Sequence, residues 1–257
     1  MFGAVYRFLL NRIPRPLLIR LSYLFKYVAP LFLAGNRFED PIDGKTYRKL
    51  LPYGYGKVQR PNALSPSSHS LERHRLLWLY LKRETDFFTR PRKLLHVAPE
   101  QCFLHRFRKM KHLEYVTADI ESPIADVKMD VQQMPFGDAH FDVVLCNHVL
   151  EHVPDDRKAM REIKRVLKDD GFAIMQVPQR FDWDKTLEDP SITDRAERER
   201  LFGQYDHLRM YGMDYPQRLK EEGFAVQIYD ISKEITSEQF QRFALPKGEM
   251  LYICRKN

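Results

Sequence analysis

The alternation of strand-like and helix-like segments from residue 92 onward constrains the fold more than any other feature of the chain. Short apolar runs typical of buried strands alternate there with segments of helical periodicity, an order that favours a doubly wound parallel sheet. In such a sheet the ligand crevice lies at the carboxyl ends of the strands. The predicted strands are 93–97, 114–118, 126–129, 141–146, 172–177, 224–230 and 250–254. The sequence therefore predicts the α/β fold class.

Two helices of this α/β part have clear ends. The segment 155–168 has apolar residues on one face, acids in its first turn and bases in its last turn, as the helix dipole favours. Asp169-Asp170-Gly171 is predicted to end this helix with a glycine stop. A second helix near 215–222 is predicted to end at Gly223.

The positive charge of the chain is concentrated at one end. The formal net charge is +7, and residues 1–38 carry +6 of it with no acidic residue, so the remainder is close to neutral at +1. A protein core that binds nucleic acid usually has a basic surface of its own. A nucleic-acid partner is therefore not expected.

The three cysteines, Cys102, Cys146 and Cys254, are widely spaced, and the last two lie in apolar strand-like runs. This spacing indicates small buried hydrophobic side chains rather than a disulfide framework or a cysteine zinc site. A reducing compartment, the cytoplasm, fits this usage.

Residues 1–38 are predicted to form a basic amphipathic helical segment. Arg20, Lys26 and Pro30 interrupt its apolar run, so it is too short for a spanning helix and a poor signal peptide. Two interpretations remain open. Residues 1–33 contact an anionic membrane surface at the inner face of the membrane, or they form a helical cap packed on the catalytic domain.

Residues 39–69 are rich in Pro, Gly, Ser and Tyr, which indicates loops and short hairpins. Two turns share the outline x-Pro-x-x of paired zinc-ribbon knuckles, but Asp40, Asp43, Ser65 and Ser68 stand where cysteines would bind zinc. A degenerate zinc-ribbon-like region without metal is predicted, and ordinary turn chemistry is the alternative. An amphipathic helix with Ser70 as its N-cap is predicted to follow.

Polar residues follow three of the predicted strands. Asp119 ends the second strand, where a carboxylate can accept hydrogen bonds from ribose hydroxyls, although an aspartate that starts a helix is the simpler alternative. Asp130 follows the third strand, where it can accept from an adenine amino group while the Val131 N–H donates to the ring. Asn147 and His148 follow the fourth strand. These residues predict a nucleoside site.

The segment DVQQMPFGDAHFDVVLCNHVLEHVPDDRKAMREIKRVLKDDGFAIMQVP resembles the class I S-adenosylmethionine-dependent methyltransferases, in particular their ubiquinone/menaquinone-biosynthesis-like small-molecule branch. The family pattern is D-x-x-x-L-P-F, F-D-x-V, L-E-H-V and E-x-x-R-V-L-K-P-G-G. Here Met134 replaces the leucine, and Asp169-Asp170-Gly171 replaces Pro-Gly-Gly. The resemblance implies a Rossmann-like fold with seven strands and S-adenosylmethionine as cofactor. The expected cofactor contacts are Ala98, Pro99, Glu100, Asp119, Ile120, Asp130, Val131 and Asn147.

The first turn, HVAPEQC, departs from that family. An acid two positions before G-x-G-x-G is usual, but here the acid is replaced by His96 and the glycines by Ala98, Glu100 and Cys102. S-adenosylmethionine has no pyrophosphate and therefore needs no phosphate cradle, and Glu100 is expected to meet its cationic amino-acid end. The turn resembles that of a bacterial subgroup that reads H-x-A-P-E after a cysteine ribbon.

The segment HVLEH, 148–152, matches the H-x-x-E-H signature of metalloproteases. That signature needs a helix, whereas a strand ends at Cys146 and Pro154 follows closely, so no metal site is expected. His148 is expected to line the cofactor pocket, and His152 to be structural or to hydrogen-bond the loop.

The segment 180–214 is predicted to be an insertion on the substrate side. Its candidate catalytic residues, together with His148, are Tyr205 and His207, which could orient an acceptor hydroxyl or take its proton, and Arg209, which could pair with an acidic substrate group. A packed, hydrogen-bonded loop is the alternative.

Three parts are thus predicted: a helical segment 1–38, a ribbon-like appendage 39–69, and a methyltransferase domain 70–257. The predicted function is S-adenosylmethionine-dependent methyl transfer to a small-molecule or lipid-linked acceptor. A scaffold that keeps the fold without the cofactor is the alternative. A dinucleotide-dependent oxidoreductase is disfavoured, because a pyrophosphate needs the glycine turn that this chain lacks.

Overall fold

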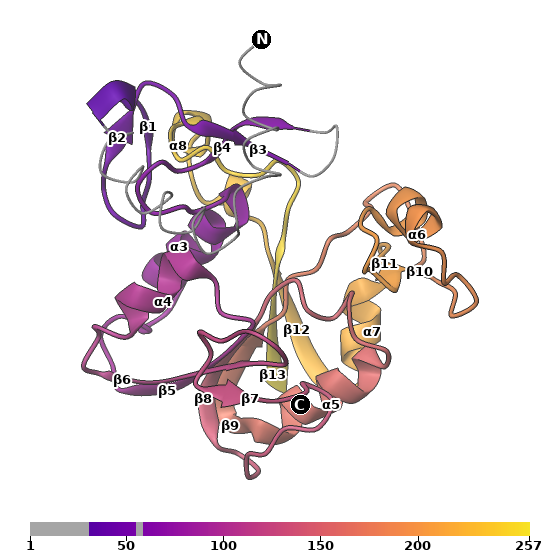
Figure 1. The fold of residues 1–257 in the computed structure, drawn as a ribbon. Coiled ribbons are helices and arrows are strands. Elements are labelled where there is room, and N and C mark those ends of the chain that lie inside the picture. Colours follow the sequence, from indigo (N-terminus) through magenta and orange to yellow (C-terminus); the bar gives the residue numbers. More distant parts are fainter. Residues whose placement is uncertain (1–30, 55–58) are drawn as a thin grey trace. The chain divides into compact units, whose positions relative to one another are not determined.

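The computed structural model describes residues 31–54 and 59–257 (Figure 1). Most of the basic N-terminal segment lies outside these residues, and with it both interpretations of that segment. The chain divides into two compact units, one of residues 1–79 with 235–247 and one of residues 80–234 with 248–257. Among the described residues, no helix is long and apolar enough to cross a membrane.

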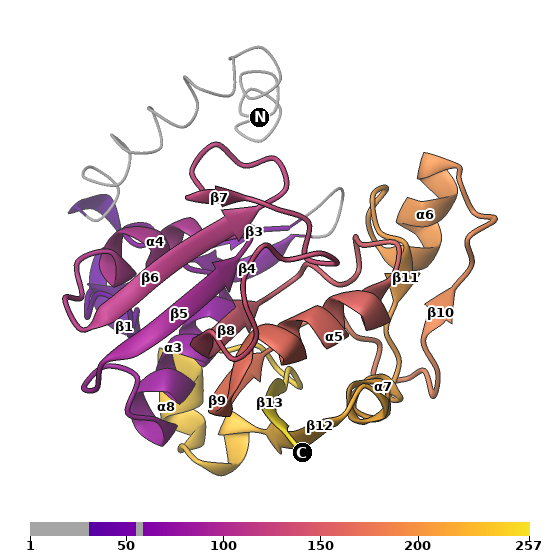
Figure 2. The same ribbon diagram turned by 90° about the horizontal axis from the view of Figure 1, so that it is seen from below.

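The second unit is built on a seven-stranded sheet in which six strands are parallel and β13 is antiparallel to its neighbours (Figures 1 and 2). In sheet order the strands are β12 (Phe224–Tyr229), β13 (Leu251–Lys256), β9 (Leu167–Ile174), β8 (Phe141–Cys146), β5 (Arg92–Val97), β6 (Leu113–Asp119) and β7 (Val127–Lys128). This arrangement confirms the predicted Rossmann-like methyltransferase fold. Because β5 lies centrally beside β8, the turns that follow these two strands meet at one edge.

Helices α5 (Asp156–Val166) and α7 (Tyr215–Glu221) pack on this sheet through one apolar core. Ala159, Ile163 and Leu219 are fully buried against strand residues such as Val144. Helix α4 (Gln101–Phe107) directly follows the turn after β5. The apolar periodicity of the sequence thus predicted which helix faces are buried.

The predicted glycine stop of α5 is wrong. Leu167 already has an extended backbone, with ψ of 138°, and strand β9 begins there. The pairing of β8 with β9 shifts register between Phe141 and Val143, so 168–171 form a bulge. A Cβ on Gly171 would lie 2.7 Å from the carbonyl oxygen of Asp142, so this glycine permits close strand approach instead. The predicted stop at Gly223, where φ is +84°, is consistent with the structure.

The insertion forms a small substructure of β10 (Leu187–Glu188), α6 (Arg195–Phe202) and β11 (Arg209–Met210). Strands β10 and β11 pair antiparallel, and both views show the three elements together, beyond α5 and α7 (Figures 1 and 2). A short 3-10 turn, Ile231–Lys233, follows β12.

The first unit contains two hairpins and parts of two further segments. Its elements are β1 (Ala34–Glu39), β2 (Thr46–Tyr47), β3 (Leu51–Tyr53), β4 (Arg60–Leu64), the first part of α3 (Glu72–Glu84), and α8 (Ser237–Arg242). The fully buried Arg75 donates hydrogen bonds to the carbonyl oxygens of Ala63, Ser70, Phe243 and Ala244. The guanidinium of Arg75 thus links the segment 235–247 to the hairpins by hydrogen bonds.

The two predicted knuckles converge in this unit. Ser68 donates to the buried carboxylate of Asp40, and Ser67 donates to the partly buried carboxylate of Asp43. Hydrogen bonds therefore join the two turns through three of the four predicted ligand positions, Asp40, Asp43 and Ser68, although a ribbon ancestry stays a prediction. Ser70 donates to Asp40 instead of capping α3, and the helix begins at Glu72.

Candidate functional site

The turn after β5 contains no glycine, but one of its residues has a backbone conformation that favours glycine. Ala98 has φ of +49°, in the left-handed region that costs a residue with a Cβ about 1 kcal/mol. Its N–H donates to the Ala118 carbonyl oxygen at 2.8 Å, which fixes the turn against β6. Pro99 is buried and Glu100 is the N-cap residue of α4, without a side-chain cap. The backbone thus follows a tight turn into a helix.

A chain of polar side chains runs from the middle of β6 to the carboxyl ends of β5 and β8. The hydroxyl of Tyr115 lies 2.8 Å from Nδ1 of the fully buried His96, and Nε2 of His96 contacts Oε2 of Glu100. The Asn147 amide donates to Oε1 of Glu100 at 3.3 Å. Burial raises the pKa of Tyr115, as does the charge of Glu100, so the hydroxyl keeps its proton as a donor.

This order of contacts assigns the proton on His96. An ionised carboxylate only accepts hydrogen bonds, so Nε2 carries the proton and Nδ1 accepts from Tyr115. Asn147 is also buried, and its Oδ1 accepts from the backbone N–H of Gln176, just after β9, at 3.4 Å. The carboxylate of Glu100 is therefore held in place from two sides, and 12% of its side chain is exposed.

The other predicted nucleoside residues lie at the same edge of the sheet. Oδ1 of Asp119 accepts from the N–H groups of Glu121 and Ser122 in a turn, so the alternative that this aspartate starts a helix is wrong, while Oδ2 has no hydrogen-bond partner among the described residues. The adjacent Ile120 is 57% exposed and offers an apolar surface to a ligand. Asp119 can therefore bind its own turn and a ligand simultaneously.

Asp130 and Val131 follow β7. The carboxylate of Asp130 is bonded to Gln132 through both the backbone N–H, at 2.8 Å, and the side-chain amide. Val131 is buried in the main core. Their contacts with a base stay a prediction.

The turn after β8 gathers ionisable groups. His148 has φ of +53°, and its Nδ1 lies 3.3 Å from Oε1 of the fully buried Glu151. Nε2 of His152 lies 3.9 Å from the same oxygen. Burial would raise the pKa of Glu151, but both histidines lower it, and the net shift is downward. A carboxylate is thus kept charged in a buried position.

The insertion residues have three different surroundings. Tyr205 is exposed at the surface, with the guanidinium of Arg195 5.1 Å from its ring centroid. His207 is buried, and its Nδ1 lies 2.8 Å from the Phe202 carbonyl oxygen. Burial lowers the pKa of His207, which favours the neutral imidazole.

Arg209 has a structural environment. Its guanidinium donates to the carbonyl oxygens of Leu150, Val153 and Pro154 at 2.6–2.9 Å, and to Glu188. These bonds fix the turn after β8 against the insertion and match the alternative of a packed loop. They use the donors that a substrate acid would need.

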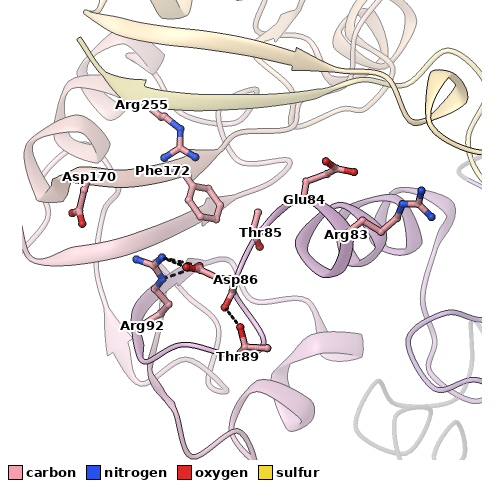
Figure 3. A pocket seen from close by; sticks show the side chains of 9 residues that line it. All are labelled: Arg83, Glu84, Thr85, Asp86, Thr89, Arg92, Asp170, Phe172 and Arg255. Atoms are coloured by element: carbon pink, nitrogen blue, oxygen red, sulfur yellow. Dashed lines mark hydrogen bonds and ion pairs between the residues drawn. The ribbon is translucent and has the colours of Figure 1, made fainter.

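Several pockets border the second unit, and two of them bear on the location of the site. One of about 540 Å³ lies between the insertion and the start of α5, and its lining includes Glu188, Ile192 and Arg198 as well as Asp155. Another of about 560 Å³ lies at the amino ends of the strands, where Arg92 pairs with Asp86 (Figure 3). The second pocket is at the edge opposite the predicted cofactor residues.

Sequence reasoning missed two members of the site. Tyr115 lies mid-strand and has no motif signal. Glu151 is part of the quoted L-E-H-V pattern but received no role of its own, although a glutamate between two histidines is a recognisable signal. All three cysteines are buried, as predicted.

The comparison with protein families finds one match: residues 93–175 fit the family described as "Methyltransferase domain". This match supports the class I methyltransferase family for that part of the chain. The ubiquinone-like branch and the subgroup with the H-x-A-P-E turn stay predictions.

Among curated proteins, the uncharacterized methyltransferase YcgJ of Bacillus subtilis is 48% identical over 44 residues, 17% of either chain. The sterol 4-C-methyltransferase strm-1 of Caenorhabditis elegans is 42% identical over 60 residues, 23% of this chain and 18% of that protein. The chain thus matches less than a fifth of the length of either relative.

Among solved structures, the [4+2]-cyclase SpnF has a TM-score of 0.53 and 15% identity, with 92% of this chain and 95% of that chain covered. The YcgJ structure of Bacillus subtilis has a TM-score of 0.47 and 17% identity, with 72% of this chain and 99% of that chain covered. At these identities the likeness concerns the fold.

Proposed function

We propose that the protein is an S-adenosylmethionine-dependent methyltransferase acting on a small-molecule or lipid-linked acceptor. The observation that carries the proposal is the chain Tyr115–His96–Glu100–Asn147, which runs from the middle of β6 to the carboxyl ends of β5 and β8. It fixes a carboxylate at the crevice where this fold binds ligands. The family match of residues 93–175 supports the same reaction class.

The residues present fit the cofactor in charge and in hydrogen-bonding type. S-adenosylmethionine is cationic at its sulfur and its ammonium group and carries ribose hydroxyls. Glu100 offers a negative charge with little solvent exposure, and Asp119 offers the free acceptor Oδ2. The left-handed Ala98 lets the backbone turn closely beside them. A dinucleotide fits poorly, because Glu100 would repel a pyrophosphate.

When bound, the cofactor supplies a methyl group activated for in-line displacement. The protein contributes chiefly by positioning. Glu100 is expected to orient the ammonium group, and Asp119 the ribose, while Asp130 and the Val131 N–H remain the residues expected at the adenine. No general base is assigned: Tyr205 is on the surface and Arg209 is engaged by the loop.

A scaffold without cofactor is the alternative. It is disfavoured because a buried carboxylate partnered by a histidine costs desolvation free energy that a purely structural turn would not need. The binding of S-adenosylhomocysteine distinguishes the methyltransferase from the scaffold, because only the methyltransferase is expected to bind it.

The test is isothermal titration of S-adenosylhomocysteine into the full chain and two aspartate variants. Asp119→Ala should weaken binding at least about tenfold, since it removes a charged hydrogen-bond acceptor. Asp169→Ala is the matched control, because this carboxylate is 92% exposed and pairs only with Lys256 at the opposite edge. Absence of binding to the wild type would refute the proposed function, and unchanged affinity of Asp119→Ala would refute the site.

A further inference from the structure

Two histidines and a glutamate from different parts of the second unit face one another. One ligand atom each of Glu151, His152 and His207 lies within 4.8 Å of the other two. Glu151 and His152 belong to the turn after β8, whereas His207 belongs to the insertion, between α6 and β11. Sequence spacing could not indicate this group, because the insertion supplies its third member.

The buried members of this cluster have polar atoms without a hydrogen-bond partner among the described residues. Both carboxylate oxygens of Glu151 and Nε2 of His207 are buried and make no hydrogen bond to any described residue. Glu151 is completely buried and His207 is 2% exposed. His148 Nδ1 lies at ion-pair distance from Glu151 Oε1, but not in hydrogen-bond geometry. Unpaired buried polar atoms are costly, so their convergence on one point indicates a missing ligand.

The histidine rings are oriented as metal ligands are. His207 directs Nδ1 at the Phe202 carbonyl oxygen, 2.8 Å away, and His152 directs Nδ1 at the carbonyl oxygen of Asp206, 3.3 Å away. These acceptors place the proton of each ring on Nδ1, so Nε2 has a free lone pair. An outer hydrogen bond of this kind fixes the tautomer and orientation of metal-binding histidines.

The backbone holds the two halves of the cluster together. The N–H of Leu208, next to His207, donates to the carbonyl oxygen of Glu151 at 2.8 Å. Arg209 binds the carbonyl oxygens of the same turn. The ligand set is therefore preorganised by bonds that do not involve the ligands' own side chains.

We propose that Glu151, His152 and His207 bind a divalent transition-metal ion of the Zn²⁺ type. Two imidazoles and one carboxylate are a recurrent donor set for such ions, and three protein ligands leave one tetrahedral position open. His152 is 35% exposed, so water or an oxygen of a small molecule can reach that position. This site does not support the metalloprotease interpretation of HVLEH, since 148–154 form a turn rather than a helix.

The test uses the full chain stripped with a chelator and titrated with Zn²⁺, and separately with Co²⁺, whose visible absorption reports coordination. We expect one Zn²⁺ per chain, a higher melting temperature when it is bound, and a Co²⁺ spectrum without thiolate bands. His152→Gln and Glu151→Gln should each weaken Zn²⁺ binding at least about 100-fold, more than loss of an outer partner usually costs. His105→Ala, at an exposed histidine of α4, is the matched control.

His152→Gln decides the result if the variant at the buried glutamate does not fold, because this histidine is partly exposed. The proposal is overturned if the wild type binds no Zn²⁺ in the micromolar range. It is also overturned if His152→Gln binds Zn²⁺ like the wild type, or if Co²⁺ shows thiolate bands that assign the ion to a cysteine. None of these measurements requires methyl transfer, so the metal site and the proposed function can fail separately.

Discussion

Replacing Glu100 by glutamine removes one negative charge from the cofactor crevice and leaves the size of the side chain unchanged. In the structure this carboxylate is held by His96 and Asn147 and is 12% exposed. A glutamine can still accept a hydrogen bond from His96, so α4 and the turn should keep their conformation. The variant therefore removes the charge together with the hydrogen bond from Asn147, because a glutamine has one acceptor oxygen and Glu100 uses two.

The magnitude follows from two limits. A hydrogen bond to a charged group contributes about 1.5–3 kcal/mol. Two opposite charges ~4 Å apart attract by about 4 kcal/mol at an effective dielectric constant of 20, an upper bound for a site that water partly reaches. We expect Glu100→Gln to weaken S-adenosylmethionine binding by about 2 kcal/mol, roughly 30-fold, since each 1.36 kcal/mol is a factor of ten. S-adenosylhomocysteine lacks the sulfonium charge and should lose less.

The assay is calorimetric titration of both ligands, with thermal melting to verify the fold. Glu114→Gln is the matched control, because Glu114 is 66% exposed on β6 and pairs with Lys93. If Glu100→Gln binds S-adenosylmethionine as the wild type does, Glu100 is not part of the site. If both ligands lose affinity equally, its charge acts on the ammonium group and not on the sulfur.

Two further predictions concern stability, each measured by urea unfolding. Burial would raise the pKa of Asp156, but its ion pair with Arg218 (2.6 Å) lowers it. The ionised carboxylate stabilises the fold above about pH 4, and this stabilisation is lost as the pH falls through the depressed pKa. Asp156→Asn should therefore lower the free energy of unfolding by about 3 kcal/mol at pH 7 and by progressively less in acid. A difference that does not change with pH would contradict this. Gly171→Ala should cost about 2 kcal/mol through contact with the Asp142 carbonyl, whereas Gly137→Ala, with open space around it, should cost under about 1 kcal/mol; equal costs would contradict the bulge explanation.

The strands of the sheet were predictable because their apolar runs are long, and because both faces of a parallel sheet are buried. Strand β8 has the predicted bounds 141–146, β5 and β12 differ by one residue at one end, and β6 differs by one residue at each end. The start of β9 was not predictable. Asp169-Asp170-Gly171 has the composition of a helix stop, and only the partner strand shows that Gly171 instead lies against a neighbouring backbone.

The candidate site was predictable only as far as strand ends reveal it. Glu100 and Asn147 were named because they follow strands, and the structure brings them together. The contribution of Tyr115 depends on register: it pairs with Leu94, two positions before His96, so its side chain lies on the same face as the histidine. A single sequence does not contain that register.

The insertion shows the same limit more strongly. His207 and Arg209 were expected to face a substrate, because polar and aromatic residues cluster around them. Arg209 instead binds carbonyl oxygens of the turn after β8, and His207 binds the Phe202 carbonyl oxygen while its ring packs on His152. The contacts with the turn join residues far apart in sequence, for which no periodicity exists. The proximity of His207 to Glu151 is therefore information that only the fold supplies.

The glycine-free first turn can now be explained in terms of charge. In the methyltransferase family that the following segment resembles, an acid precedes the glycine turn, whereas this chain has His96 at that position and its acid four residues later. The contact between His96 and Glu100 brings the carboxylate back to the end of β5, and the hydroxyl of Tyr115 fixes the histidine from the other side. The negative charge is thus present although the residue that usually provides it is not. For Glu100 to reach His96, the chain must reverse direction tightly at Ala98. This requirement explains the left-handed backbone conformation of an alanine.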